Sequence, residues 1–183
     1  SASLAMVSCR RCGMCFVGKV IIVLLLAYSF VFVACEDSEP VESIDAFNEL
    51  QESLYDVVRV VDGDTLIVNI EGVEERVRLI GVDTPESMHP DEGKNSPLGD
   101  IASEFTKNAL EGCSVAIEID VQDRDQYGRL LAYVYVDGIM FNKILLYEGM
   151  AQMATFPPNV KYVEEFKEIQ KGAVEAGRGF WGE

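Results

Sequence analysis

The stretch DVVRVVDGDTLIVNIEGVEERVRLIGV, residues 56–82, decides the fold that the sequence predicts. Three runs rich in Val, Leu and Ile are separated by the pairs Asp62-Gly63 and Glu71-Gly72. Pairs of this kind between apolar runs are typical of tight hairpin turns. The runs before, between and after the two pairs are therefore expected to form three consecutive antiparallel strands.

Strand and helix patterns continue after this three-stranded meander. A polar, turn-rich loop is expected at residues 88–98, helices at 102–112, 140–150 and 161–177, and strands at 114–120 and 129–136. The order is three strands, a helix, two strands and two helices. Five strands with helical insertions suit an α+β fold that is mainly a β-barrel, namely a five-stranded Greek-key barrel of the OB-fold type with three helices.

The start of the chain has the composition of an export segment. Residues 20–34 read VIIVLLLAYSFVFVA and follow Lys19. This run is short of the roughly 20 residues that cross a bilayer, and it fits the apolar centre of a signal peptide. Its end at Ala34, directly before Cys35, resembles the lipobox of bacterial lipoproteins, with Cys35 as the lipidated residue. A plain signal peptide and an uncleaved anchor are the alternatives, so the protein is expected at the cell envelope or outside the cell.

The charge divides the remainder of the chain. We expect a signal peptide at 1–35, an acidic tether at 36–54 and a folded domain at 55–183. Residues 36–56 contain eight acidic residues and no base, and residues 57–183 contain 23 acidic and 12 basic residues. Such a domain is not suited to bind polyanions through bulk charge. A role in nucleic-acid chemistry therefore needs a local basic site or a bound cation.

The available side chains exclude several kinds of catalysis. His89 is the only histidine, and no G-x-S-x-G motif accompanies it, which argues against a serine or cysteine triad. The cysteines Cys9, Cys12 and Cys15 lie before the apolar run and lack a fourth cysteine nearby, and Cys113 stands alone in the domain. Carboxylates, arginines, tyrosines and lysines remain, and these suit phosphoryl chemistry with a hard, oxygen-seeking cation.

Charged residues stand where the predicted strands end. Asp64 follows the first turn pair, and Asp83 and Glu86 follow the third strand. Arg78 lies within the third strand, and Arg129 opens the fifth. Taken singly, each residue is compatible with an ordinary solvated position, although a buried Arg78 would need a partner.

Taken together, these residues belong to linked motifs. The sequence has V-D-G-D-T at 61–65, R-L-I-G-V-D-T-P-E at 78–86 and D-x-Y-G-R-x-L-A-Y at 125–133, and it ends with G-R-G-F-W at 177–181. In this order and at these separations, the motifs resemble the staphylococcal nuclease (thermonuclease) family. The resemblance covers residues 55–183 and implies an OB-type barrel with three helices that uses Ca²⁺ to hydrolyse DNA and RNA and leaves 3′-phosphates.

The resemblance also implies a role for each matched residue. Asp64 and Asp83 would bind Ca²⁺ through carboxylates and Thr84 through its backbone carbonyl, since calcium prefers oxygen ligands. Glu86 would act as general base on the attacking water. The two arginines, Arg78 and Arg129, would bind the scissile phosphate.

Substrate contacts are implied as well, with departures from the family pattern. Tyr127 matches a tyrosine near a terminal phosphate of the bound nucleotide, and Phe156 falls near the family's nucleotide-stacking tyrosines. Gln126 replaces a lysine, and the domain is acidic. We expect single-stranded or denatured DNA, or RNA, as substrate, a membrane tether, and a monomer. A non-catalytic OB module that binds oligonucleotide or protein, and a calcium-binding envelope protein, are the alternatives.

Overall fold

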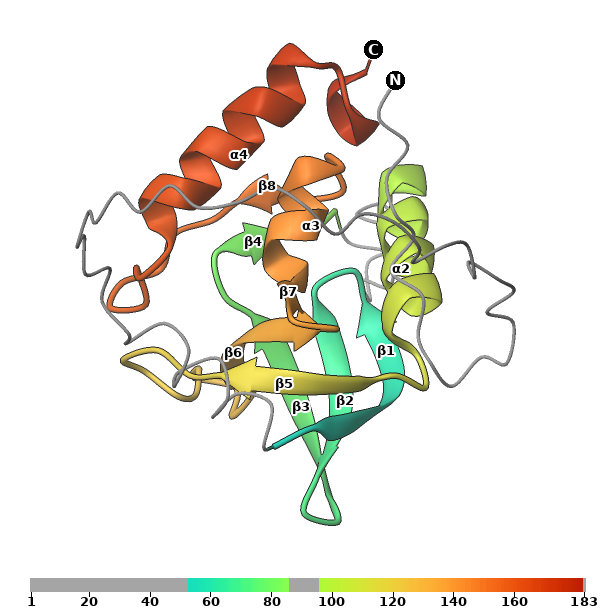
Figure 1. The fold of residues 1–183 in the computed structure, drawn as a ribbon, viewed down its shortest axis with the longest axis vertical. Helices are drawn as coiled ribbons and strands as arrows, with labels where there is room; N and C mark the ends of the chain where they lie inside the picture. Colours follow the sequence, from blue (N-terminus) through green and yellow to red (C-terminus); the bar gives the residue numbers. More distant parts are fainter. Residues whose placement is uncertain (1–52, 86–95, 183) are drawn as a thin grey trace, which may run out of the picture.

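The computed structural model describes residues 53–85 and 96–182 (Figure 1). The predicted signal peptide with Cys35, most of the acidic tether and the predicted base Glu86 lie outside the described residues, so these assignments stay predictions. Within the described ranges, no helix is both long and apolar enough to cross a membrane.

Five long strands form the body of the domain, as predicted, and three two-residue strands add to them. The elements are β1 (Tyr55–Asp62), β2 (Thr65–Ile70), β3 (Val73–Leu79), β4 (Val82–Asp83), α2 (Pro97–Leu110), β5 (Ser114–Glu118), β6 (Leu130–Val136), β7 (Ile139–Met140), α3 (Phe141–Tyr147), β8 (Gln152–Met153), α4 (Val163–Glu175) and the 3₁₀ helix η2 (Gly179–Trp181).

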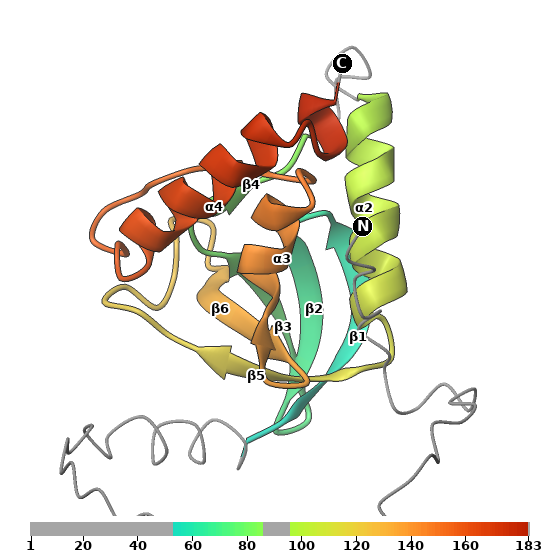
Figure 2. The same cartoon turned by 45° about the horizontal axis from the view of Figure 1, so that its top comes forward.

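The strands close into a barrel. Their order is β3-β2-β1-β5-β6-β7, and β3 also pairs with β6 in parallel, from Val77 opposite Leu130 to Leu79 opposite Ala132. This pairing joins β3, at one end of the sheet, to β6, the last long strand near the other end, and confirms the predicted OB-fold barrel. Helix α2 packs along β1, and α3 packs between the barrel and α4 (Figures 1 and 2).

The core fills the barrel and the space beneath the C-terminal helices. Strand residues such as Leu66, Val77 and Val134 are fully buried, as are Phe141 of α3 and Phe166 of α4. The barrel and both helices thus share one core. Its close packing holds β3 and β4, which carry charged side chains, in fixed positions.

The first hairpin turn differs from the prediction. Asp62 pairs with Thr65, so the turn residues are Gly63 and Asp64 rather than Asp62 and Gly63. A Cβ at position 63 would lie 2.8–3.0 Å from three atoms of the Thr84 side chain. Glycine is therefore needed here because Thr84 approaches the turn closely. The second turn agrees with the prediction, since Glu71 and Gly72 both have positive φ, as a tight hairpin turn requires.

Helix α2 begins at Pro97, inside the stretch predicted as a loop. Ser96 caps the helix, and its Oγ accepts a hydrogen bond from the backbone N of Leu98 at 3.2 Å. Proline fits the first helical turn because no backbone donor is needed there. Ser96 and Pro97, which were expected in a loop, therefore start this helix.

Candidate nuclease site

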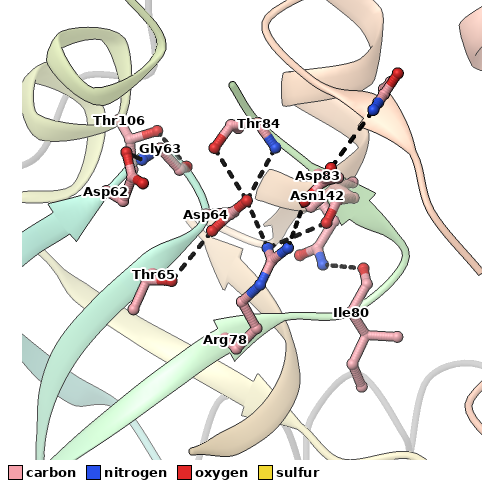
Figure 3. Close-up of polar contacts among 12 residues, drawn as sticks. Asp62, Gly63, Asp64, Thr65, Arg78, Ile80, Asp83, Thr84, Thr106 and Asn142 are labelled. Atoms are coloured by element: carbon pink, nitrogen blue, oxygen red, sulfur yellow. Dashed lines mark hydrogen bonds and ion pairs between the residues drawn. The ribbon is translucent and has the colours of Figure 1, made fainter. Parts of the chain in front are cut away.

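Arg78 extends from β3 and is held between two carboxylates (Figure 3). Its Nη1 lies 2.6 Å from Asp64 Oδ2, and its Nη2 lies 2.9 Å from Asp83 Oδ1. Nη1 also donates to the backbone carbonyl of Val82 at 3.1 Å. The Arg78 side chain is only 14% exposed, so the partner that a buried arginine requires is present.

Asp64 is enclosed more fully than Asp83. Its Oδ2 accepts hydrogen bonds from the backbone N and the Oγ1 of Thr84, at 2.9 and 3.0 Å, and its Oδ1 accepts one from Thr65 Oγ1 at 3.1 Å. Burial raises the pKa of Asp64 above its ordinary value, while the Arg78 guanidinium and the hydrogen bonds from Thr84 act in the opposite direction. We call Asp64, Arg78, Asp83 and Thr84 the Arg78 corner.

Two helices support the Arg78 corner from behind. Thr106 of α2 is fully buried, and its Oγ1 donates to the carbonyl of Gly63 at 2.7 Å. Asn142 of α3 donates to the carbonyl of Ile80 at 2.8 Å and accepts from the backbone N of Val134 at 3.0 Å. These contacts fix both segments that carry the carboxylates (Figure 3).

The oxygen atoms of the Arg78 corner form a candidate cation site. Asp64 and Asp83 both pair with the Arg78 guanidinium, so their carboxylates lie on the same side chain's two Nη atoms. No group of three His, Cys, Asp or Glu side chains suited to a metal occurs among the described residues. A cation would therefore need backbone carbonyl and water oxygens in addition. Calcium accepts such an oxygen-only set, so these residues fit the predicted ion.

Arg129 lies in a local turn that begins at Asp125. Its Nε is 2.6 Å from Asp125 Oδ2, while Asp125 Oδ1 accepts from the backbone N atoms of Tyr127 and Arg129, both at 2.9 Å. Burial acts to raise the pKa of Asp125, but the hydrogen bonds from Arg129 and Tyr127 outweigh it, and the pKa lies below its ordinary value. We call residues 125–129 the Arg129 corner.

One pocket joins the two corners. It has a volume of about 460 Å³, and Arg78, Arg129, Tyr127 and Phe156 all line it. The structure therefore brings together four predicted site residues from three separate segments of the chain. Asp64, Asp83 and Thr84 do not line the pocket. Asp64 and Asp83 contact Arg78, and Thr84 contacts Asp64.

Exposed rings stand at this pocket. Tyr127 is 75% and Phe156 is 71% exposed, although large aromatic rings usually lose most of their surface on folding. The Arg129 guanidinium carbon lies 5.5 Å from the centre of the Tyr127 ring. Both rings therefore have free surface available for contact with a planar ligand.

Polar residues without a predicted role also line the pocket. Asn159 is 4% exposed; its Nδ2 donates to the carbonyl of Gln122 at 2.8 Å, and its Oδ1 accepts from the backbone N of Gln122 at 2.7 Å. This amide joins the wall that carries Phe156 to the wall that leads to Asp125. Asp125 lies in the motif at 125–133, so the sequence could have marked it as a site residue. Asn159 instead holds the pocket wall through its contact with Gln122, which is far away in the sequence.

Comparisons with known proteins agree with this geometry. Residues 76–183 match the family model described as Staphylococcal nuclease homologue. The thermonuclease of Staphylococcus hyicus is 39% identical over 162 residues, which cover 88% of this chain and 94% of that protein. The thermonuclease of Staphylococcus intermedius is 46% identical over 127 residues, covering 69% and 75%. Endonuclease YncB of Bacillus subtilis (strain 168) is 39% identical over 135 residues, covering 72% and 64%. The chain therefore belongs to the staphylococcal nuclease family.

Proposed function

We propose that this protein is a calcium-dependent nuclease that hydrolyses phosphodiesters of DNA and RNA and leaves 3′-phosphates. The observation that carries the proposal is the pocket into which Arg78 and Arg129 both extend, with exposed aromatic rings at its edge. Membership of the family and the nuclease names of the relatives support the same activity.

The two arginines would bind the phosphate that is cleaved. A guanidinium stays protonated and directs paired N–H groups at phosphate oxygens, which stabilises the charge that develops in the transition state. Among the described residues, the Arg129 guanidinium makes its hydrogen bond through Nε, so Nη1 and Nη2 are available to the substrate. Arg78 instead uses both Nη atoms on carboxylates, so a phosphate would have to share or replace those partners.

Asp64, Asp83 and the backbone carbonyl of Thr84 would hold calcium. When bound, the ion supplies positive charge that offsets the phosphate and favours ionisation of a bound water. Glu86 would accept the proton of the attacking water, a role proposed from its place two residues after Thr84 in the motif. Asp64 would be suited to a cation because its burial otherwise disfavours its own charge.

Unpaired bases are the proposed partners of the exposed rings. Stacking on Tyr127 and Phe156 needs a base whose face is open, as in single-stranded or denatured DNA and in RNA. Gln126, which also lines the pocket, adds no positive charge. Binding would therefore depend on stacking and on the two arginines rather than on a basic surface.

The test uses the purified protein with denatured DNA or RNA, in millimolar calcium or in chelator. Calcium-dependent release of acid-soluble nucleotides with 3′-phosphate ends is the expected result. Release that is equal in chelator would contradict the calcium requirement.

The variant Glu86→Gln is expected to lose rate by orders of magnitude while it still binds calcium and oligonucleotide. Binding of oligonucleotide without hydrolysis by the unaltered protein would identify a non-catalytic OB module.

A further inference from the structure

Asp125 is a carboxylate in a pocket whose proposed ligand is an anion. It lines the pocket together with Arg78 and Arg129, and its side chain is only 15% exposed. A negative charge at this place repels phosphate and lowers the attraction that the arginines supply. Its presence therefore calls for a role that outweighs this repulsion.

The contacts of Asp125 indicate that role. Oδ2 lies 2.6 Å from Arg129 Nε, and Oδ1 accepts from the backbone N atoms of Tyr127 and Arg129. One carboxylate thus holds the backbone of the turn with one oxygen and the guanidinium with the other. Because Nε is bonded, the plane of the guanidinium is fixed while both Nη atoms stay available to a ligand.

We propose that Asp125 is a positioning residue that acts through Arg129 and orients its guanidinium towards the phosphate. This inference deepens the proposed function and rests on it. A guanidinium that is already oriented stabilises the transition state without reorganising during the reaction. The contact of Arg129 with the Tyr127 ring, 5.5 Å away, depends on the same turn.

The substitution Asp125→Asn separates positioning from the structural role of the turn. The asparagine carbonyl oxygen still accepts from the two backbone N–H groups, so the turn is retained. Its other terminal atom becomes an NH₂ group, which cannot accept from Arg129 Nε. Only the contact that orients the guanidinium is then lost, along with one negative charge.

The experiment measures steady-state hydrolysis of denatured DNA in calcium by the full-length protein, Asp125→Asn and a matched control. Glu165→Gln is the control. Glu165 pairs with Lys143 at 2.7 Å outside the pocket, so this substitution removes the same charge and one ion pair away from the site. Asp125→Asn is expected to lower kcat by about 10- to 100-fold. KM should stay equal or fall, since a repulsive charge has gone. Unchanged kcat, or a raised KM at unchanged kcat, would overturn the proposal.

A second measurement shows whether Asp125 acts through Arg129. In an Arg129→Lys background, Asp125→Asn is expected to change kcat less than twofold, because the group that it orients is missing. The same fold-loss in both backgrounds would overturn the proposal.

An NMR measurement without substrate distinguishes failure of this inference from failure of the proposed function. The Arg129 Nε–H signal should be protected from exchange in the unaltered protein and should lose that protection in Asp125→Asn. Equal exchange in both proteins would contradict positioning. Protected exchange in a protein that hydrolyses nothing would contradict only the proposed nuclease function.

Discussion

The Arg78 corner and the Arg129 corner hold their arginines in different ways. Arg78 is paired with carboxylates from two other segments and is only 14% exposed. Arg129 is paired with Asp125 four residues earlier in the chain, and it is 29% exposed. The first arrangement exists only when the barrel has formed, whereas the second is contained in one turn. A change at Arg78 should therefore affect both folding and catalysis, and a change at Arg129 should affect mainly catalysis.

The largest expected effect is that of Arg78→Ala. It leaves Asp64, whose side chain is 8% exposed, without its cationic partner. Removal of one member of such a buried pair typically costs about 3–5 kcal/mol of unfolding free energy. Activity should fall at least 10²- to 10³-fold as well, the usual cost of losing one transition-state donor. Urea unfolding and nuclease assays measure the two effects. An unchanged free energy of unfolding would show that the Arg78–Asp64 pair does not stabilise the fold.

The matching change, Arg129→Ala, should separate activity from stability. Activity is expected to fall by roughly 10²- to 10³-fold, because a phosphate contact is lost. Unfolding free energy should change by less than about 1 kcal/mol, because the lost pair is local and partly exposed. The same assays apply, and a loss of stability as large as that of Arg78→Ala would remove the proposed difference between the corners.

A third change, Gly63→Ala, tests the packing of the Arg78 corner without altering a charge. The new Cβ would meet Thr84 at 2.8–3.0 Å, and Thr84 holds Asp64. Overpacking of this kind typically costs about 1–3 kcal/mol. Gly172→Ala in α4 is the control, because outside its chain neighbours and its own helix backbone no atom lies within 4 Å of the added Cβ, and it should stabilise the helix by about 0.5–1 kcal/mol. Thermal unfolding measures both variants. An equal shift of the unfolding temperature would show that Thr84 does not restrict position 63.

The smallest effect concerns the pH dependence of the Arg129 corner. The pKa of Asp125 is lowered from 3.8 in the folded protein, so its contribution to stability is present above pH 3.8 and is lost as the pH falls through the lowered pKa. The stability difference between the unaltered protein and Asp125→Asn, at most about 1 kcal/mol, should therefore shrink on acidification. Thermal unfolding across a pH series measures it, and a difference that grows towards acid pH would show the wrong sign.

The same contrast explains what the sequence could predict. The turn at Glu71-Gly72 and the Asp125–Arg129 contact depend on near neighbours, so their motifs carry the information locally. The five strands follow from the alternation of apolar and polar residues and from the turn residues. These patterns predict the class of barrel but not the β3–β6 pairing that closes it. Contacts between distant segments carry no such local signal.

The parts of the site that no local pattern predicts are contacts of this distant kind. The resemblance already implied that Arg78 and Arg129 bind one phosphate, and the parallel pairing of β3 with β6 shows how the fold places both at one pocket. Glycine is needed at position 63 because Thr84 packs against it, and Asn159 holds the pocket wall because it bonds to Gln122. Each depends on tertiary packing that no short window of residues records.

Arg78 and Arg129 are proposed to act on the same phosphate. A double-mutant cycle with Arg78→Lys, Arg129→Lys and both together tests it most directly, since lysine keeps the charge but loses the paired donors. Calcium-dependent hydrolysis of denatured DNA is the rate to measure, with circular dichroism to verify folding. If both arginines act on one phosphate, the double variant should lose much less activity than the product of the two single losses. Losses that simply multiply would show that the two arginines act independently and would contradict the shared site.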